Sequence, residues 1–187
     1  MLKRAFDILV SAALLVVLSP FFILCGILVR FGSPGPIFHI SQRVGRGNKI
    51  FLMPKFRSMH VGTPQIATHL IEDPQSLLTP AGRFLRRTSL DELPQLWSVL
   101  VGDMSLVGPR PALFNQHDLV AERTRRGIDV LRPGITGWAQ INGRDEISLE
   151  RKVELDHHYL VHSTFLLDLK ILLSTLWKTS RSEGVSH

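Results

Sequence analysis

The sequence has few of the residues that stabilise small domains through covalent bonds or metals. Only one of its 187 residues is cysteine, Cys25, so the chain cannot form an internal disulfide. Eight histidines are scattered along it, and no Cys/His spacing typical of zinc sites occurs. His157 and His158 are neighbours, and neighbours on a helix point in different directions. A disulfide scaffold is therefore excluded, and a structural zinc site is disfavoured.

The sequence also lacks the glycine patterns of common nucleotide-binding folds. Without a Walker or Rossmann motif, nucleoside triphosphate hydrolysis and hydride transfer are poorly supported. The net charge of +6 suits nucleic acid, an anionic membrane surface or phosphorylated substrates. Since no zinc-finger or RNA-binding signature occurs, nucleic acid ranks last among these three partners.

An apolar segment occupies the N-terminal end of the sequence. Residues 8–29 carry no charge, and such a run is about as long as a transmembrane helix. It is too long for the apolar part of a signal peptide, and no small-residue cleavage site follows it. We therefore expect a membrane element over residues 1–31 and a globular domain over residues 32–187, with the basic surface of the domain facing the cytoplasm.

A proline divides this apolar run near its midpoint. Pro20, which follows Ser19, lacks a backbone donor and clashes with the preceding turn, so it kinks or breaks a helix. Lys3 and Arg4 precede the run and Arg30 follows it, and positive residues prefer the cytoplasmic side. The pattern suits a re-entrant helix with both ends on one face. A kinked spanning helix fits equally well, because membrane helices tolerate proline.

The rest of the chain predicts a mostly helical α+β domain with one small β-hairpin. The hairpin strands are expected at 37–40 and 50–53, around a basic turn that contains glycine. Helices are expected at 81–87, 92–101, 114–127, 148–161 and 165–178. The segment 132–144 contains three glycines and a proline and is expected to be a structured loop. The last helix has an apolar stripe that suits either the core or the membrane interface, and we favour an interfacial or mixed position.

Two adjacent carboxylates, Asp91 and Glu92, are the first candidates for chemistry. Asp91 suits a helix N-cap, and Ser89 with Glu92 matches a capping box, so the local pattern alone favours a structural role. The same position would keep a carboxylate ionised, so that it could bind Mg²⁺ or attack an electrophile. Both interpretations stay open on the local pattern.

Cationic residues elsewhere favour the chemical interpretation. Prolines on both sides stiffen Arg110, and arginines on rigid turns suit bidentate phosphate binding. Each of these cations is also a candidate for an ordinary solvated surface residue. The candidates for phosphate binding are Lys55, Arg57, Arg86, Pro109, Arg110, Pro111 and Arg144.

These motifs together resemble the bacterial sugar transferases, the monotopic polyprenyl-phosphate phosphoglycosyl transferases, in their small form. The resemblance covers nearly the whole chain, and several of its motifs are long and ordered. They are SP at 19–20, KFRSM at 55–59, TSLDELPQ at 88–95, GDMSLVGPRP at 102–111, RPGITGWAQ at 132–140, NGR at 142–144 and LDLK at 167–170. The sequence departs from the family pattern at none of them.

The resemblance implies a compact monotopic domain on the cytoplasmic face of a bacterial inner membrane. It implies a re-entrant helix broken at Ser19-Pro20, interfacial amphipathic helices, and contacts with membrane lipids. The implied enzyme moves a sugar 1-phosphate from a UDP-sugar to polyprenyl phosphate and releases UMP, early in glycoconjugate synthesis. Asp91 would be the nucleophile of a ping-pong reaction and a Mg²⁺ ligand, with Glu92 assisting. Asp168 joins the substrate-binding candidates, and a homodimer stays open.

Two other functions stay open on the sequence. A membrane phosphatase or pyrophosphatase would use the same aspartate and Mg²⁺, and it would release free sugar phosphate without any lipid acceptor. A non-catalytic membrane scaffold would leave the nucleotide-sugar intact.

Overall fold

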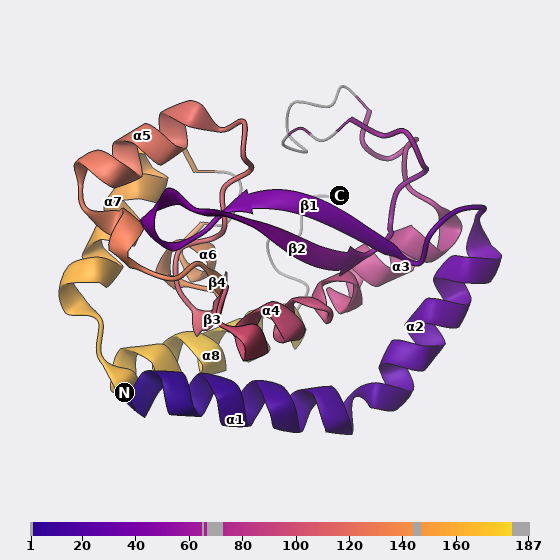
Figure 1. Ribbon diagram of the computed structural model, residues 1–187, viewed down its shortest axis with the longest axis horizontal. Coiled ribbons are helices and arrows are strands. Elements are labelled where there is room, and N and C mark those ends of the chain that lie inside the picture. The colour runs from indigo at the N-terminus through magenta and orange to yellow at the C-terminus, as the bar shows by residue number, and fades with distance from the viewer. Residues whose placement is uncertain (1, 65, 67–72, 144–146, 181–187) are drawn as a thin grey trace.

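The computed structural model describes residues 2–64, 66, 73–143 and 147–180. Two long helices, α1 and α2, run along one edge of the molecule and then turn up beside it, and the rest of the chain packs in the angle between them (Figure 1). A β-hairpin crosses this angle, and the other helices surround it (Figure 1). The fold is mostly helical with small sheets, as the sequence predicts.

The N-terminal apolar run forms two helices that meet at the predicted break. Helix α1 covers Leu2–Val17 and α2 covers Ser19–Gly32, and their axes are bent by 62°. Pro20 lies in the first turn of α2, where its missing N–H group costs no helical hydrogen bond. Among the described residues no single helix is long and apolar enough to cross a membrane, but this bent pair meets the length and composition test together.

The predicted hairpin is confirmed, and its strands are longer than expected. Strand β1 (Phe38–Val44) pairs antiparallel with β2 (Ile50–Phe56), with Val44 opposite Ile50 at the closed end. A short 3-10 helix, η1 (Arg46–Asn48), closes the hairpin. Alternation places Phe51 and Met53 in the core, while Ile50 and Leu52 are exposed on the opposite face.

The remaining elements follow the predicted order with different bounds. They are α3 (Pro80–Arg87), η3 (Leu90–Glu92), α4 (Gln95–Val101), β3 (Ser105–Val107), α5 (His117–Arg125), η4 (Ile128–Val130), β4 (Gly134–Thr136), α6 (Trp138–Ile141), α7 (Leu149–His162) and α8 (Phe165–Ser180). The expected loop over 132–144 instead contains β4, which pairs in parallel with β3, and α6. Three-residue strands carry too little periodicity to be recognised in a sequence.

The core forms where the N-terminal helices, the hairpin and the later helices meet. Val99 of α4 and Ile171 of α8 are fully buried in its largest cluster, beside Met53 of the hairpin. Cys25 and Val29 of α2 pack with Phe56 and Leu85 in a second cluster. Helices α1 and α2 therefore share the core of the domain that follows them.

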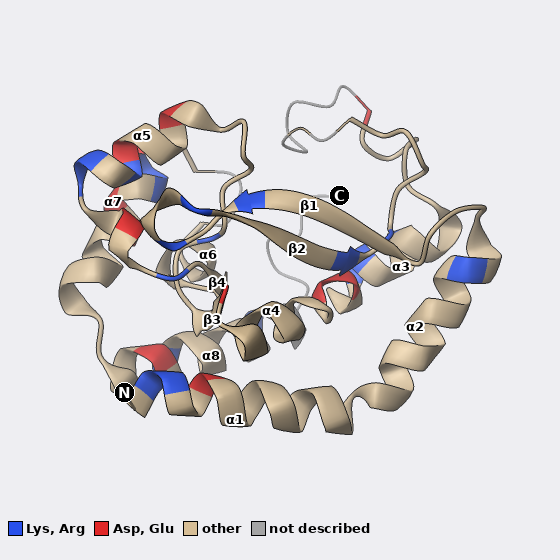
Figure 2. Cartoon of the chain, viewed as in Figure 1, with Lys and Arg blue, Asp and Glu red and all other residues tan. Residues whose placement is uncertain are grey.

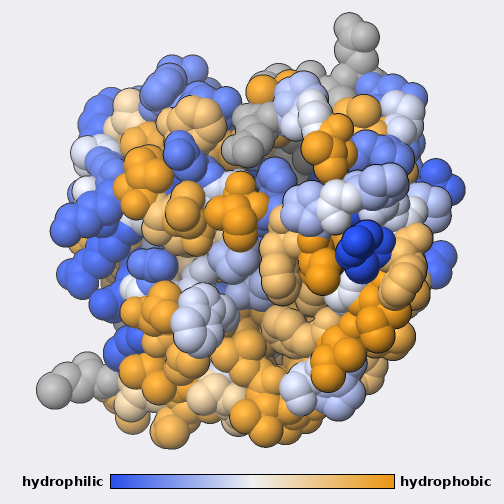
Figure 3. All heavy atoms as spheres, turned by 45° about the vertical axis from the view of Figure 1, so that its right-hand side comes forward, coloured by the Kyte–Doolittle hydropathy of each residue, from blue (hydrophilic) through white to orange (hydrophobic). Residues whose placement is uncertain are grey.

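Apolar side chains also remain exposed on one side of the molecule. Figure 2 shows no charged residue on α1 and α2 between the first turns of α1 and Arg30. Figure 3 shows apolar side chains gathered over the lower and right-hand parts of the surface, with hydrophilic residues on the left. The stripe of α8 is divided between core and surface, because Leu172 packs on the core whereas Leu173 and Trp177 are exposed. The stripe is therefore not wholly part of the core, and a membrane interface for its exposed part stays a prediction.

Candidate active site

A cavity of about 1050 Å³ lies between the hairpin, α3, η3 and the loop that follows β3. Asp91 and Glu92 line it together with Lys55, Arg86 and Arg110. The structure therefore brings both predicted carboxylates and four of the predicted cations to one cavity, since Arg57 lines it as well. Arg144 lies outside the described residues.

A tight turn presents the two carboxylates, and the helix cap expected there does not form. Ser89 adopts a left-handed conformation with φ 55° and makes no side-chain capping bond, so the predicted capping box is absent. Asp91 lies inside the 3-10 helix η3 and is buried. Helix α4 begins only at Gln95, and Pro94 is its N-cap, not part of its first turn. The structural explanation for Asp91 is thus wrong, because a non-glycine residue at positive φ turns the chain before the helix starts.

Glu92 is held by cations on two sides. Lys55 Nζ lies 2.6 Å from Glu92 Oε1, and Arg110 lies 3.8 Å from the same oxygen. Burial alone would raise the pKa of Glu92, but Lys55 and Arg110 outweigh it and lower the pKa to about 2. Glu92 is therefore a permanent anion at neutral pH, and it fixes the Lys55 ammonium in the cavity wall.

Asp91 behaves differently from its neighbour. Burial raises its pKa to about 6, helped by the negative charge of Glu92 and opposed by Lys55, Arg86 and Arg110. Within the described residues, its carboxylate makes no close ion pair comparable to the one between Lys55 and Glu92. Two adjacent carboxylates with pKa values pushed in opposite directions are a pattern of acid–base and nucleophilic sites.

Arg86 extends the positive wall of the cavity. Its Nε donates to Ser58 Oγ at 3.0 Å, and burial lowers its pKa while Asp91 and Glu92 act in the opposite direction. Arg43, which the sequence interpretation did not select, also lines the cavity, and burial lowers its pKa to about 10. It shares its strand face with Ser41, so the alternation of β1 was the signal that could have identified it.

Arg57 also lines the cavity, but its guanidinium is engaged by the backbone. It is buried, and its guanidinium donates to the backbone carbonyls of Ser33, Pro34 and Pro36 at 2.7–2.8 Å. These bonds fix the linker between α2 and the hairpin. The sequence could not show this, because a Gly/Pro-rich linker gives no sign of which side chain will satisfy its carbonyls.

The prolines around Arg110 act through their backbone. The carbonyl of Pro109 accepts from the Gly134 N–H at 2.9 Å, and that of Pro111 accepts from Arg43 at 3.2 Å. Arg123 donates to the Arg110 carbonyl at 2.9 Å and is itself held by Asp156 at 2.6 Å. The loop that carries Arg110 is therefore fixed from three directions, as the flanking prolines predict.

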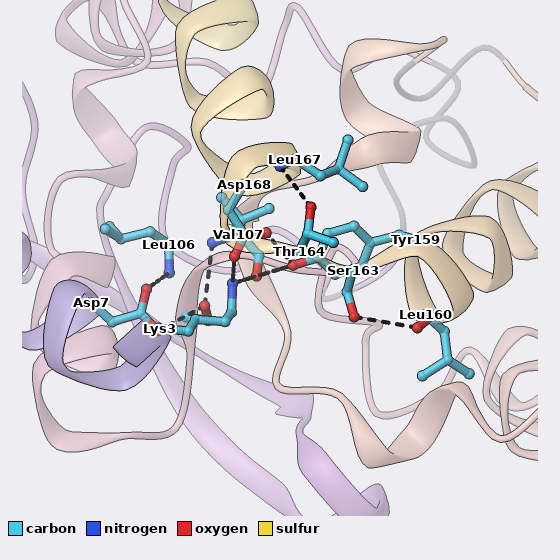
Figure 4. A network of polar contacts seen from close by, with 11 residues as sticks. Lys3, Asp7, Leu106, Val107, Tyr159, Leu160, Ser163, Thr164, Leu167 and Asp168 are labelled. Carbon is cyan, nitrogen blue, oxygen red and sulfur yellow. Dashed lines mark hydrogen bonds and ion pairs between the residues drawn. The ribbon is translucent and has the colours of Figure 1, made fainter. Parts of the chain in front are cut away.

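Asp168 lies in a different place from the predicted substrate site. It does not line the cavity, and its carboxylate accepts from Lys3 at 2.6 Å and from Tyr159 at 2.5 Å (Figure 4). Lys3 also donates to the Val107 carbonyl at 3.0 Å. Nearby, the Asp7 carboxylate accepts from the Leu106 backbone N–H (Figure 4). These contacts fasten α1 to β3, α7 and α8, and we call them the α1 latch.

The described part of the chain has no group of three His, Cys, Asp or Glu side chains placed to hold a metal. A magnesium ion does not need one, because Mg²⁺ is usually bound by one or two carboxylates together with substrate phosphates. Asp91, with Glu92 beside it, is a donor set of that kind at the cavity wall.

Comparisons with known proteins agree over the length of the chain. The family described as bacterial sugar transferase matches residues 1–182. An uncharacterized sugar transferase, EpsL of Bacillus subtilis, is 44% identical over 186 residues, which is 100% of this chain and 91% of that protein. The UDP-glucose:undecaprenyl-phosphate glucose-1-phosphate transferase of Escherichia coli is 40% identical over 95% of this chain and 40% of its own length.

A third relative differs in the sugar that its name records. The UDP-N-acetylgalactosamine-undecaprenyl-phosphate N-acetylgalactosaminephosphotransferase of Aeromonas hydrophila is 35% identical over 94% of this chain and 43% of its own length. The chain thus spans less than half of these last two proteins and nearly all of EpsL. Because the family match extends through almost every residue, the chain belongs to the bacterial sugar transferases and is a transferase enzyme.

Proposed function

We propose that this enzyme transfers a sugar 1-phosphate from a UDP-sugar to a polyprenyl phosphate and releases UMP. One observation carries the proposal: a buried Asp91 with a raised pKa stands beside a permanently ionised Glu92 in a cavity walled by Lys55, Arg86 and Arg110. Such a wall suits a diphosphate, and a buried carboxylate with a raised pKa beside these cations suits a nucleophile. The names of the Escherichia coli and Aeromonas hydrophila relatives record this kind of reaction.

The proposed reaction has two displacement steps at phosphorus. An Asp91 carboxylate oxygen attacks the sugar-bearing β-phosphorus, and the bond from that phosphorus to the bridging oxygen breaks, so that UMP leaves with the electron pair. An oxygen of the lipid phosphate then attacks the same phosphorus, and the bond to Asp91 breaks. The products are the polyprenyl diphosphate sugar and the free carboxylate, so the site is regenerated.

The cations stabilise charge throughout these steps. Lys55 is fixed by Glu92 and Arg110 by its clamped loop, so little reorganisation is needed when negative charge develops on the leaving phosphate. With its pKa near 6, Asp91 is mostly ionised at neutral pH and is more basic than an ordinary aspartate. A Mg²⁺ ion at Asp91 would supply further neutralisation of the diphosphate when bound.

The proposal places the domain on the cytoplasmic face of the bacterial membrane. The bent pair of α1 and α2 would enter the lipid and turn back at Ser19-Pro20, and the exposed apolar residues of α4 and α8, such as Trp97 and Trp177, would lie in the interface. This arrangement lets one substrate arrive from water and the other from the bilayer. A covalent intermediate suits it, because the two substrates need not be bound together.

The test is a UMP-release assay on protein extracted in detergent with Mg²⁺ and a panel of UDP-sugars, with and without undecaprenyl phosphate. We expect UMP and lipid-linked sugar to form together with at least one donor. Quenched samples without lipid should contain protein that carries one sugar phosphate, detectable by intact mass and absent from Asp91→Asn. Free sugar phosphate without lipid would indicate a phosphatase or pyrophosphatase instead, and intact donors throughout would contradict catalysis of this kind.

A further inference from the structure

Gln140 is the residue in the cavity wall whose hydrogen bonds are unaccounted for. It lies in α6 and lines the same cavity as Asp91. Both its Oε1 and its Nε2 are buried, and neither has a hydrogen-bond partner within the described part of the chain. It is the one side chain there for which two polar atoms are in this state. Leaving an amide unpaired in the interior costs roughly 1–3 kcal/mol, so such a group calls for an explanation.

The backbone around Gln140 fixes where the amide lies. A side chain on Gly137 would come within 2.0 Å of the Gly108 carbonyl and within 2.8 Å of Gln140 Oε1. Residue 137 must therefore be glycine for α6 to pack against the loop that begins at Gly108. That loop also carries Arg110, a cation of the proposed diphosphate site, so α6 packs against an element of that site.

Other uncharged polar side chains line the same cavity as Gln140. Thr175 donates its hydroxyl hydrogen to the Ile171 carbonyl at 2.8 Å, so in the 2.7 Å contact between Thr136 and Thr175 the donor is Thr136. The Thr136 oxygen keeps its acceptor lone pairs. Gln116 uses its Oε1 to accept from the Leu113 N–H, and its amide nitrogen carries two donors. We call Gln116, Thr136 and Gln140 the polar arm of the cavity, since all three line it.

The polar arm differs from the rest of the cavity in the ligand that it suits. The wall around Asp91 and Glu92 contains Arg43, Lys55, Arg86 and Arg110, and these charged groups suit phosphate and metal chemistry. A wall of amides and a hydroxyl offers alternating neutral donors and acceptors, and a sugar ring presents hydroxyl groups that are each both donor and acceptor. We propose that Gln140 recognises hydroxyl groups of the transferred sugar and so takes part in donor selection.

This inference rests on the proposed function, because it assigns part of the UDP-sugar to the same cavity. Both amide atoms are covered in the present structure, so the amide must turn into the cavity to meet the ligand. Binding of the sugar then gives hydrogen-bond partners to both Oε1 and Nε2 of Gln140. A site of this kind discriminates strongly against an analogue that lacks the hydroxyl, because the buried polar groups of the site are then left unpaired.

The decisive experiment compares the intact enzyme with Gln140→Leu in the UMP-release assay and in thermal unfolding. Leucine has a similar volume and no polar atoms. We expect Gln140→Leu to unfold at a higher temperature than wild type, because a buried unpaired amide is removed, while kcat/KM for the preferred UDP-sugar falls about ten- to a hundredfold. The affinity for UMP alone should be unchanged. Gln42→Leu, at an exposed position on the hairpin, is the matched control and should leave both kcat/KM and UMP affinity at wild-type values.

A second arm tests the hydroxyl directly with deoxy analogues of the preferred donor. In wild type, removal of the recognised hydroxyl should lower kcat/KM by a similar factor, and in Gln140→Leu the same removal should have little further effect. A loss of UMP affinity in Gln140→Leu would show that the amide contacts the nucleotide and not the sugar, and this would overturn the inference. So would a lower unfolding temperature combined with wild-type kcat/KM, since that marks a structural role. If wild type releases UMP from no donor, the proposed function fails. If wild type is active and Gln140→Leu has the same kcat/KM, only this inference fails.

Discussion

At the scale of single residues, Asp91 shows how burial tunes one carboxylate against its neighbour. Asp91→Asn removes the proposed nucleophile and keeps the shape of the side chain. We expect the variant to fold and to release UMP at least a thousandfold more slowly, on the order of the losses seen when a nucleophile is removed. Glu92→Gln should also be strongly impaired, because Lys55 loses its fixed partner at 2.6 Å. Near-normal UMP release by Asp91→Asn would contradict the assignment.

The raised pKa of Asp91 makes the same variant informative about stability. The folded protein holds this proton up to about pH 6 whereas the unfolded chain releases it near its ordinary value, so stability falls as pH rises between these values. Asparagine carries no such cost. In the absence of divalent cations, Asp91→Asn should therefore be more stable than wild type at about pH 8, by about 3 kcal/mol at most, and the difference should shrink as pH falls below 6. Denaturant unfolding at a series of pH values measures it, and a pH-independent difference would refute it.

The activity of the wild-type enzyme should follow the same ionisation. If Asp91 must be ionised to attack phosphorus, kcat/KM for the UDP-sugar should rise with pH and level off above an apparent pKa near 6. Glu92 does not titrate in that range, because Lys55 and Arg110 outweigh its burial and keep its pKa near 2. Added Mg²⁺ should move the midpoint to lower pH. A profile that is flat from about pH 5 to 8 would argue against this titration.

Arg110 provides a test of phosphate recognition. Its side chain is 42% exposed, and its backbone, not its guanidinium, is fixed by Arg123, so Arg110→Ala should leave the unfolding temperature nearly unchanged. The loss of a charge-assisted bond to phosphate should lower kcat/KM about ten- to a hundredfold, mainly through a higher KM for the donor. Arg125→Ala removes an exposed arginine of an ion pair on α5 and is the control. Equal kinetics in the two variants would exclude Arg110 from the site.

The sequence was a good guide to residues whose role depends on local motif, and a poor one where the role depends on distant backbone. Lys55, Arg86, Arg110 and Asp91 reach one cavity as expected. Arg57 is held away from the role of an open cation, because backbone carbonyls more than twenty positions away accept from each of its three guanidinium nitrogens. The orphaned amide of Gln140 is equally invisible in the sequence, since only the packing of α6 buries it.

At the scale of elements, the N-terminal helix is bound to the domain by polar contacts that its composition hides. The helix reads as a membrane segment, yet its buried residues are Asp7 and Ser11. Asp7 accepts from Ser105 and Leu106, almost a hundred positions later in the chain. Periodicity reveals that a helix has a distinct face but not which partner that face meets, and this is why the helix break could be predicted and the α1 latch could not.

The α1 latch can be tested through Asp168. In Asp168→Asn, Lys3 and Tyr159 lose a charged partner that is almost fully buried, so the unfolding temperature should fall clearly. Because Asp168 lies outside the cavity, the KM for the UDP-sugar should stay near the wild-type value. Glu154→Gln breaks the exposed Arg151–Glu154 pair and should change the unfolding temperature little. A raised KM with an unchanged unfolding temperature would restore Asp168 to the substrate site and contradict the latch.

At the scale of the whole molecule, the α1 latch and the helix break both determine on which side of the membrane the N-terminus lies. Lys3 and Arg4 are bound to the domain that carries Asp91, through the Asp168 carboxylate and the carbonyls at the end of α4. If α1 crossed the bilayer, these contacts could not form. A membrane-bound form with the present structure must therefore return its N-terminus to the side of the active site, which favours the re-entrant arrangement over the kinked spanning helix.

Topology labelling tests this last prediction. In a Cys25→Ala background, a cysteine at Leu2 should react with an impermeant maleimide only after the cells are permeabilised, as should a cysteine at the exposed Glu154 of α7. Replacing Ser19 and Pro20 by Ala and Leu restores an apolar helix of about 20 residues, enough to span. Insertion of this helix across the bilayer then competes with the α1 latch, so Leu2→Cys should become reactive in intact cells. Adding Asp168→Asn weakens the latch and should make this labelling more complete. Labelling of Leu2→Cys from outside with Ser19 and Pro20 in place would refute the re-entrant arrangement, while the chemistry at Asp91 would be unaffected.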